Sequence, residues 1–169
     1  MHHIVTQTIK TPLGEMLAGA TSQGICMLEF TDTGRLDMQY ASLEKSFSAK
    51  IIEAESKYFE PLRLELNAYF NGSLQNFKTP LDIKGSPFQI QAWDALLKIP
   101  YGETHSYQQQ AHAINKPKGF RAVASANRKN RISILIPCHR VIAKNGNLAG
   151  YGGGLDRKQF LLNLENKSE

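Results

Sequence analysis

The chain has 169 residues, 41% of them hydrophobic and 21% charged, a composition that excludes a disordered protein and fits one ordinary domain or two small ones. Its apolar runs are far too short to span a membrane, and its two cysteines cannot build a disulfide framework or a four-ligand zinc cluster. Twenty Lys and Arg against fifteen Asp and Glu leave a net charge of +5, which permits a polyanionic partner without requiring one.

The first half is predicted to be a small α/β domain. Residues 3–31 alternate polar and apolar side chains between short Gly- or Pro-bearing breaks, so we expect an antiparallel meander. Residues 36–48 and 59–71 have helical periodicity. The N-terminus shows no signal-peptide pattern, and a free thiol without an export signal suits the reducing cytoplasm, where we expect the protein to work.

A polar connector, residues 73–84, separates this half from a second part of different character. We therefore expect two domains, residues 1–80 and 85–169. The second begins with Ser86-Pro87-Phe88-Gln89, which combines an N-cap serine, a proline at the first helical position and a capping box, and so predicts a helix that ends before Pro100.

The next two helices are predicted to form a helix-turn-helix. A second capping box, Ser106-Tyr107-Gln108-Gln109, starts a helix through Ile114, and the basic break 115–119 leads into a helix that ends near Asn127. Basic residues surround the second helix: Lys116, Lys118, Arg121, Arg128, Lys129 and Arg131. Either its small residues lie against DNA and the basic residues contact phosphates, or the pair is an ordinary helical hairpin with solvated lysines. These features alone leave both interpretations open.

The segment Pro137-Cys138-His139-Arg140-Val141 follows the aliphatic run 132–136. An adjacent imidazole can convert a thiol to the nucleophilic thiolate. We expect the aliphatic run to fix the Cys-His pair in a core and the proline to end that run. The alternative is an inert core cysteine beside a surface histidine, because free cysteine is among the most buried residue types.

Residues 141–148 are predicted to form a β-hairpin with Asn145-Gly146 at the two turn positions that need positive φ. The glycine-rich stretch 150–154 is either a linker or a loop that shapes itself around a ligand. A last helix begins at Asp156.

Glu165 is unusual in that last helix. It lies four residues after Leu161, on the apolar face, and near the helix C-terminus, where the macrodipole disfavours an anion. A buried carboxylate needs a partner, and a ring N–H of His139 would complete the orientation chain of a nucleophilic triad. The alternative is a frayed terminal glutamate in solvent.

In chain order, the helix-turn-helix, the Cys-His pair, the glycine loop and the acid together resemble the O6-alkylguanine-DNA alkyltransferases, also called methylated-DNA–protein-cysteine methyltransferases. The match runs from Gly85 to Glu165, and its Pro-Cys-His-Arg-Val signature is highly specific. The first half resembles the family only in layout. It lacks the Cys/His set that binds zinc in some members, so we expect no metal and no other cofactor.

The resemblance implies an α/β (α+β) fold with two domains. The N-terminal one is a small antiparallel-sheet domain, ribonuclease H-like, and the C-terminal one is a mainly helical, winged-helix-like DNA-binding domain with a helix-turn-helix. It also implies direct-reversal DNA repair: a monomer flips O6-alkylguanine, with O4-alkylthymine as a further substrate, out of double-stranded DNA and keeps the alkyl group after one turnover. Cooperative binding along DNA stays open.

The resemblance implies roles for five catalytic residues. Cys138 is the alkyl acceptor, and His139 draws the thiol proton through a bridging water while Glu165 orients that histidine. Tyr107 gives a proton to the leaving guanine and crowds the 3′ phosphate. Asn130 is the hinge that ties the recognition helix to the active-site strand.

The resemblance also implies two binding surfaces. The first is a surface that binds the minor groove of DNA. Its contacts are expected from Tyr107, Lys118, Arg121, Ala122, Ala124, Ser125, Ala126, Asn127 and Arg128. Arg121 is the finger that replaces the flipped nucleotide in the stack. The guanine pocket is formed by Val141, Tyr151, Gly152, Gly153 and Lys158. Many members have serine where this chain has Gly152, so we expect a backbone N–H in place of one side-chain contact and more room for larger alkyl groups. Asn127 stands where members often have an apolar residue.

Three other functions compete with repair. A protein that only flags lesions resembles this family but lacks the cysteine, so Cys138 argues against it. A helix-turn-helix regulator would show a dimer interface and a larger recognition face for the major groove. A cysteine hydrolase using Cys138, His139 and Glu165 would turn over, and it would leave Arg121 and the small helix face unexplained.

Overall fold

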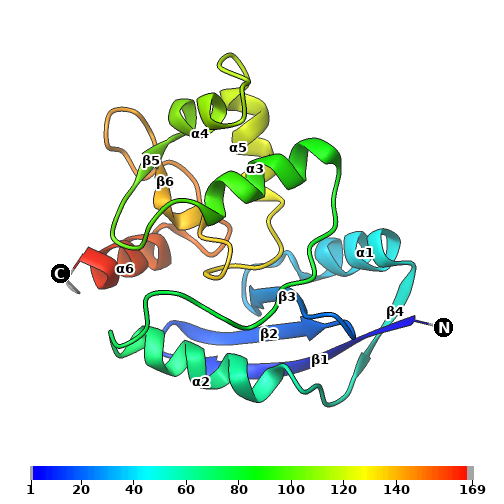
Figure 1. Cartoon of the computed structure of the whole chain (residues 1–169). Coiled ribbons are helices and arrows are strands. Elements are labelled where there is room, and N and C mark those ends of the chain that lie inside the picture. Colours follow the sequence, from blue (N-terminus) through cyan, green and yellow to red (C-terminus); the bar gives the residue numbers. More distant parts are fainter. Residues whose placement is uncertain (1, 167–169) are drawn as a thin grey trace. The chain divides into compact units, whose positions relative to one another are not determined.

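The computed structural model describes residues 2–166, and the chain divides into two compact units, residues 1–84 and 85–169 (Figure 1). Within the described part no helix is both long and apolar enough to cross a membrane. Each unit has its own elements and is taken by itself.

The first unit is built on a four-stranded sheet. β1 (His2–Thr11), β2 (Gly14–Ala20) and β3 (Ile25–Phe30) form the predicted antiparallel meander. The sequence does not predict β4 (Ala49–Glu53), which pairs in parallel with β1 and gives the strand order β3-β2-β1-β4. The sheet is therefore mixed rather than wholly antiparallel.

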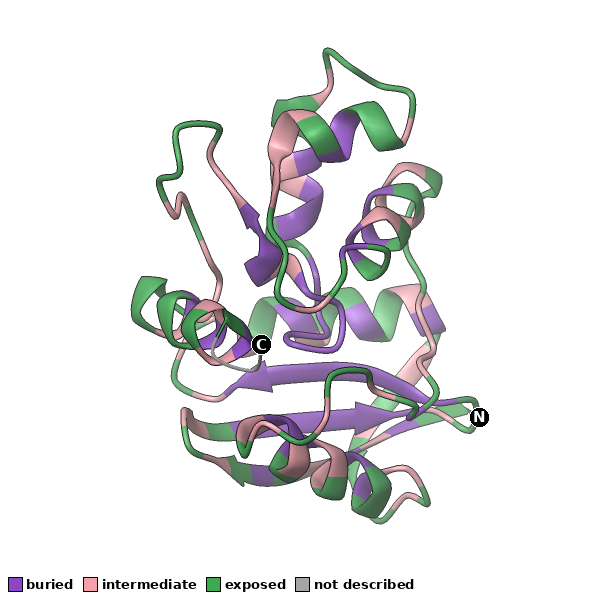
Figure 2. Ribbon diagram, turned by 60° about the vertical axis from the view of Figure 1, so that its left-hand side comes forward, coloured by how far each residue is buried: buried purple, intermediate pink, exposed green. Residues whose placement is uncertain are grey.

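Two helices cover this sheet at the predicted positions. α1 (Leu36–Phe47) contacts β4, and α2 (Phe59–Phe70) contacts β1. Buried apolar side chains of α1 and three strands form one core cluster: Ile4, Leu17, Cys26, Met27, Leu43 and Phe47. β3 is buried along its whole length and β2 along most of its length (Figure 2).

The second unit is mainly helical, with α3 (Pro87–Leu97), α4 (Tyr107–Ala113), α5 (Phe120–Arg128) and α6 (Leu155–Asn166). Both predicted capping boxes are present, at Ser86 for α3 and at Ser106 for α4. Helices α3, α4 and α5 pack against one another. The sheet of this unit is minimal, because β5 (His105–Ser106) and β6 (Val141–Ile142) pair in parallel over two residues each.

The turn between α4 and α5 completes the helix-turn-helix. Asn115, two residues after the end of α4, has φ of 60°, a left-handed conformation that asparagine adopts more readily than most residues. Gly119 then donates its N–H to the carbonyl of Lys116 at 2.7 Å, which closes a tight turn ahead of Phe120.

The aliphatic run 132–136 is buried as predicted, but it forms turns rather than a strand. The N–H of Leu135 donates to the Ser133 carbonyl at 2.8 Å, and that of Ile136 donates to the Ile132 carbonyl at 3.1 Å. Ile134 has φ of 72°, an outlier for a β-branched residue that costs on the order of 1–3 kcal/mol. The expected active-site strand is thus a strained, buried turn that leads into the 3₁₀ helix η1 (Cys138–Arg140).

The predicted hairpin 141–148 is only half formed. Gly146 donates to the Ala143 carbonyl at 2.9 Å, and Ala143 donates to the Asn147 carbonyl at 2.8 Å. Of the predicted Asn-Gly pair, Gly146 alone has positive φ, which indicates a type I turn followed by a bulge glycine. No second strand follows in the described chain, because β6 takes its partner from β5 instead.

Candidate active site

Cys138 lies in a cavity of about 180 Å³ within the second unit. The cavity is walled by α4, α5 and the loop before α6, and its lining is Tyr107, Ala124, Asn127, Arg128, Cys138, Ala149, Gly150, Tyr151 and Gly152. Cys138 is partly exposed and lines the cavity, so a ligand there can reach its side chain.

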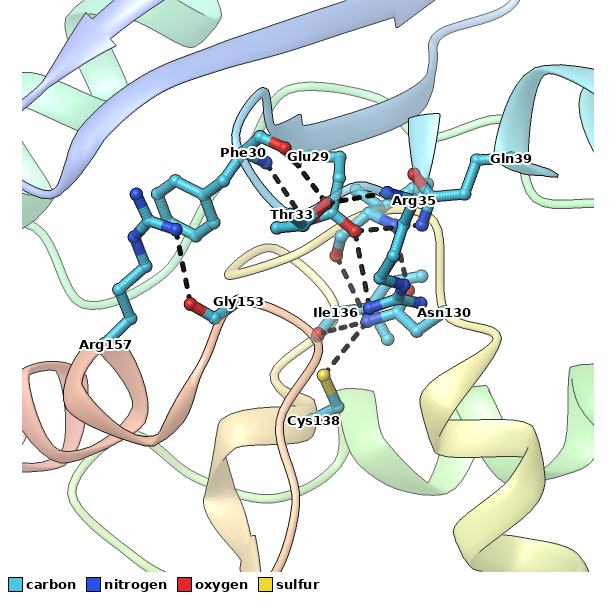
Figure 3. A network of polar contacts seen from close by, with 11 residues as sticks. Glu29, Phe30, Thr33, Arg35, Gln39, Asn130, Ile136, Cys138, Gly153 and Arg157 are labelled. Atoms are coloured by element: carbon cyan, nitrogen blue, oxygen red, sulfur yellow. Dashed lines mark hydrogen bonds and ion pairs between the residues drawn. The ribbon is translucent and has the colours of Figure 1, made fainter. Parts of the chain in front are cut away.

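Asn130 connects α5 to the turn that carries the thiol (Figure 3). Its Nδ2 donates to the Ile136 carbonyl at 3.0 Å and to the Cys138 Sγ at 3.4 Å, while its Oδ1 accepts from the N–H of Ile132 at 3.0 Å. The side chain is buried. Asn130 therefore fixes the strained turn and directs an N–H at the sulfur, which favours the charged thiolate over the thiol.

Glu165 is the buried acid that the sequence indicates, and it contacts the predicted histidine. Its Oε2 lies 2.7 Å from His139 Nε2. Arg140, which the sequence interpretation misses, donates Nε to Glu165 Oε1 at 2.7 Å and Nη2 to Oε2 at 3.1 Å. Arg140 also donates Nη1 to the Ile99 carbonyl at 2.8 Å. The guanidinium thus offsets the unfavourable position of the carboxylate at the helix C-terminus.

The charges of this triad follow from its burial and contacts. Burial alone would raise the pKa of Glu165, but hydrogen bonds from His139 and Arg140 and the positive charge of Arg140 lower it to about 2, so the carboxylate is ionised at neutral pH. Burial lowers the pKa of His139, so its imidazole is neutral. An ionised carboxylate only accepts hydrogen bonds, and therefore Nε2 carries the ring proton. Nδ1 keeps a lone pair; it is buried and has no hydrogen-bond partner among residues 2–166.

Lys158 is fully buried and organises the loop that forms one cavity wall. Its Nζ donates to the Val141 carbonyl at 2.6 Å and the Gly150 carbonyl at 3.1 Å, and it also bonds the Leu148 carbonyl. Burial lowers the pKa of Lys158 to about 8, while the charge of Cys138 opposes that shift. At neutral pH the ammonium is present and favours a negative sulfur.

Tyr107 begins α4 and lines the cavity. Burial raises its pKa, and so does the charge of Cys138, so the phenol holds its proton at neutral pH. A protonated phenol beside the nucleophile can donate to a leaving group.

The exposed face of α5 is smaller than the sequence interpretation assumes. Arg121, Ala122 and Arg128 are exposed, Ala124 and Ser125 are half-buried, and Lys118 is exposed in the preceding turn. Two of the residues predicted to contact DNA are buried in the free protein, Ala126 at 3% exposure and Asn127 at 8%, although Asn127 also lines the cavity. The Ala126 carbonyl accepts from Trp93 Nε1 at 2.9 Å, so this side of α5 packs on α3. Arg131 is buried beside the same indole, which removes it from the basic surface.

The residues predicted for the guanine pocket are only partly those that line the cavity. Tyr151 and Gly152 line the cavity, but Val141, Gly153 and Lys158 do not. Val141 is fully buried, and its carbonyl and that of Gly153 accept from Lys158 and Arg157. The side chains of Lys158 and Arg157 thus hold the backbone next to the cavity without lining it. Ala149 and Gly150 were missed because nothing in a glycine-rich stretch marks which residues face inward.

Asn127 pairs with Gln110 in a buried amide bridge between α4 and α5. Asn127 Nδ2 donates to Gln110 Oε1 at 2.8 Å, Gln110 Nε2 donates to Asn127 Oδ1 at 2.9 Å, and Gln110 Nε2 also donates to the Ala92 carbonyl of α3 at 3.0 Å. This bridge ties the helix that begins with Tyr107 to the helix that lines the cavity.

Removing one partner of this bridge should destabilise the unit more than removing both. Gln110→Leu leaves the buried amide of Asn127 unsatisfied, and we expect it to lower the free energy of unfolding by about 1–3 kcal/mol. The double variant Gln110→Leu, Asn127→Met should lose less than the sum of the two single changes, because apolar partners of similar shape then meet. Urea unfolding of the four proteins measures this, and additive losses would contradict it.

Comparisons with known proteins identify the family of this chain. Two family models match the chain: the 6-O-methylguanine DNA methyltransferase ribonuclease-like domain over residues 4–83, and its DNA binding domain over residues 87–167. The methylated-DNA–protein-cysteine methyltransferase of Methanosarcina barkeri is 40% identical over 158 residues, covering 93% of this chain and 94% of the relative. The inducible one of Bacillus subtilis is 43% identical over 124 residues, 73% of this chain and 69% of that relative. The crystal structure of Mycobacterium tuberculosis OGT in complex with DNA superposes with a TM-score of 0.81 at 37% identity, covering 98% of this chain and 94% of that one.

Proposed function

The chain belongs to the 6-O-methylguanine DNA methyltransferase family, and on that premise we propose that it repairs O6-alkylguanine in double-stranded DNA by transferring the alkyl group to Cys138. The observation that carries this proposal is the placement of Cys138: a partly exposed sulfur in an open cavity, with the Asn130 N–H directed at it and the Glu165–His139 pair beside it.

The transfer is a single in-line displacement. The thiol proton of Cys138 passes through a water molecule to Nδ1 of His139, which Glu165 holds in the tautomer that leaves this nitrogen basic. The sulfur attacks the alkyl carbon, a C–S bond forms and the C–O6 bond breaks. The electron pair goes to guanine, and Tyr107 donates the proton that neutralises it.

The base must leave the duplex first, because the O6 substituent of a paired guanine cannot reach a thiol inside a protein cavity. Arg121 is exposed on α5, and Lys118 and Arg128, which suit phosphates, are exposed too. It takes the place of the flipped nucleotide from the minor-groove side, where inserted side chains offset the cost of unstacking.

Each molecule reacts once. A thioether is a poor leaving group, and the other cysteine, Cys26, is buried in the core of the first unit. The second unit, residues 85–169, carries the chemistry and the DNA contacts, and residues 1–80 support it. The protein acts as a monomer in the cytoplasm, where both thiols stay reduced.

The test uses a duplex oligonucleotide with one O6-methylguanine and the intact mass of the protein. Wild type should gain one methyl group, localised to Cys138, whereas Cys138→Ala should gain none. Cys26→Ala is the matched control and should react like wild type. Lesion binding without a mass gain would replace this function with lesion flagging, and absence of any lesion preference would favour a transcription regulator. Release of a product with unmodified Cys138 would favour a hydrolase.

A further inference from the structure

Phe120 is an exposed aromatic residue on the DNA-facing helix that the mechanism above does not use. It is the first residue of α5, and 37% of it is exposed. Among the large hydrophobic side chains exposed in the described chain, Phe160 at 41% is the other aromatic one, and it lies on α6.

The helical repeat places Phe120 on the cavity side of α5. Residues four and seven positions later share a helix face with it, and these are Ala124 and Asn127, which both line the cavity of Cys138. Four residues of helix rise about 6 Å, so Phe120 lies about one turn beyond the cavity wall.

Phe120 also contacts the residue assigned to insertion. The guanidinium carbon of Arg121 lies 5.8 Å from the centroid of the Phe120 ring, within the range of a cation–π interaction. The turn before them exposes Lys116 and Lys118, so the ring stands on a positive surface suited to phosphates. An exposed apolar ring at such a place would be covered if a nucleic acid bound there.

We propose that Phe120 is a second DNA-inserting side chain, which stacks on the base step beside the flipped guanine while Arg121 fills the vacated position. The inference rests on the proposed function and adds a contact to it. Phenylalanine is among the apolar side chains that unstack base steps from the minor groove. The cation–π contact holds the two side chains together, so that both enter the groove as one unit.

Two substrates separate this role from a structural one. O6-Methylguanine in duplex DNA requires flipping, whereas free O6-benzylguanine base reaches Cys138 without it. For Phe120→Ala we expect the rate constant with duplex DNA, divided by the rate constant with free base, to fall about tenfold. A decrease of this size is in the range expected for the loss of one base–aromatic stack. Phe160→Ala removes a ring of similar exposure from α6 and should leave the ratio at the wild-type value.

The measurement is the pre-steady-state rate of mass gain on Cys138 with each substrate. A ratio in Phe120→Ala equal to that in wild type would overturn the proposal, and so would an equal loss with both substrates, which indicates a folding defect. If wild type itself gains no mass from either substrate, the proposed function fails instead, which keeps the two outcomes distinct.

Discussion

Glu165→Gln will slow alkyl transfer to Cys138 on the order of 100-fold, in line with the loss of one positioned acid–base group. The amide nitrogen of glutamine can donate to His139 Nε2, which moves the ring proton to Nδ1 and removes the base. The same change leaves the Arg140 guanidinium buried without its counter-ion, which should lower the free energy of unfolding by about 3–5 kcal/mol.

A double variant separates these two effects. In Glu165→Gln, Arg140→Met the uncompensated charge is gone, so a large part of the lost stability should return. The transfer rate should stay low, because a neutral amide, unlike the carboxylate, does not stabilise the imidazolium that forms when His139 takes the thiol proton. Time courses of methyl transfer give the rate, and urea unfolding gives the stability, for wild type, the single variant and the double variant. Recovery of the rate together with the stability would show that Glu165 acts only on folding.

The same carboxylate predicts a dependence of stability on pH. The pKa of Glu165 falls from its ordinary 4.5 to about 2 in the folded state, through its contacts with His139 and Arg140 and against the effect of burial. Between pH 4.5 and pH 2 the Glu165 carboxyl is therefore protonated in the unfolded chain and ionised in the folded one. This difference contributes about 3 kcal/mol to the free energy of unfolding above pH 4.5, and the contribution is lost as the pH falls towards 2. The stability difference between wild type and Glu165→Gln should shrink over this range.

Lys158→Met should slow transfer about 100-fold from both duplex DNA and free base. Displacing a reacting group by about 1 Å lowers a rate by about this factor. The three carbonyls that Lys158 holds belong to β6 and to the loop beside the cavity. Without the ammonium they turn to solvent, the cavity wall shifts, and the sulfur loses a nearby positive charge.

The matched control is Lys144→Met, which removes an exposed lysine from the neighbouring turn. It should react like wild type. The loss in Lys158→Met is expected to be similar for the two substrates, in contrast to Phe120→Ala, since the cavity itself is altered. Wild-type rates with both substrates would contradict a supporting role for Lys158.

Most of the fold follows from local signals in the sequence. The capping boxes at Ser86 and Ser106 place two helix starts, and alternation places the first three strands. β4 was missed because its five residues do not alternate polar and apolar side chains and because its pairing partner, β1, lies nearly fifty residues earlier. The run 132–136 has strand composition, but Asn130 and the positive φ of Ile134 hold it as a turn, which periodicity does not reveal.

The site was predicted better in its catalytic contacts than in its surfaces. Glu165 was identified because a buried acid at a helix C-terminus needs a partner, and its contact with His139 is present. Arg140 was missed because arginines are usually solvated, and sequence alone does not show a long side chain folding back on a distant acid. The burial of Ala126 and Asn127 depends on how α3 and α4 pack against α5, which small-residue composition does not specify.

Cys138 is expected to accept one alkyl group and to react only once, and a titration tests this directly. Protein at fixed concentration is incubated to completion with increasing amounts of duplex bearing O6-methylguanine, and methyl transfer is measured by intact mass and by loss of the lesion. We expect repaired lesions to rise in proportion and stop at one per chain, with every chain methylated on Cys138. Repair that continues beyond one lesion per chain, or a plateau with unmodified Cys138, would contradict the account.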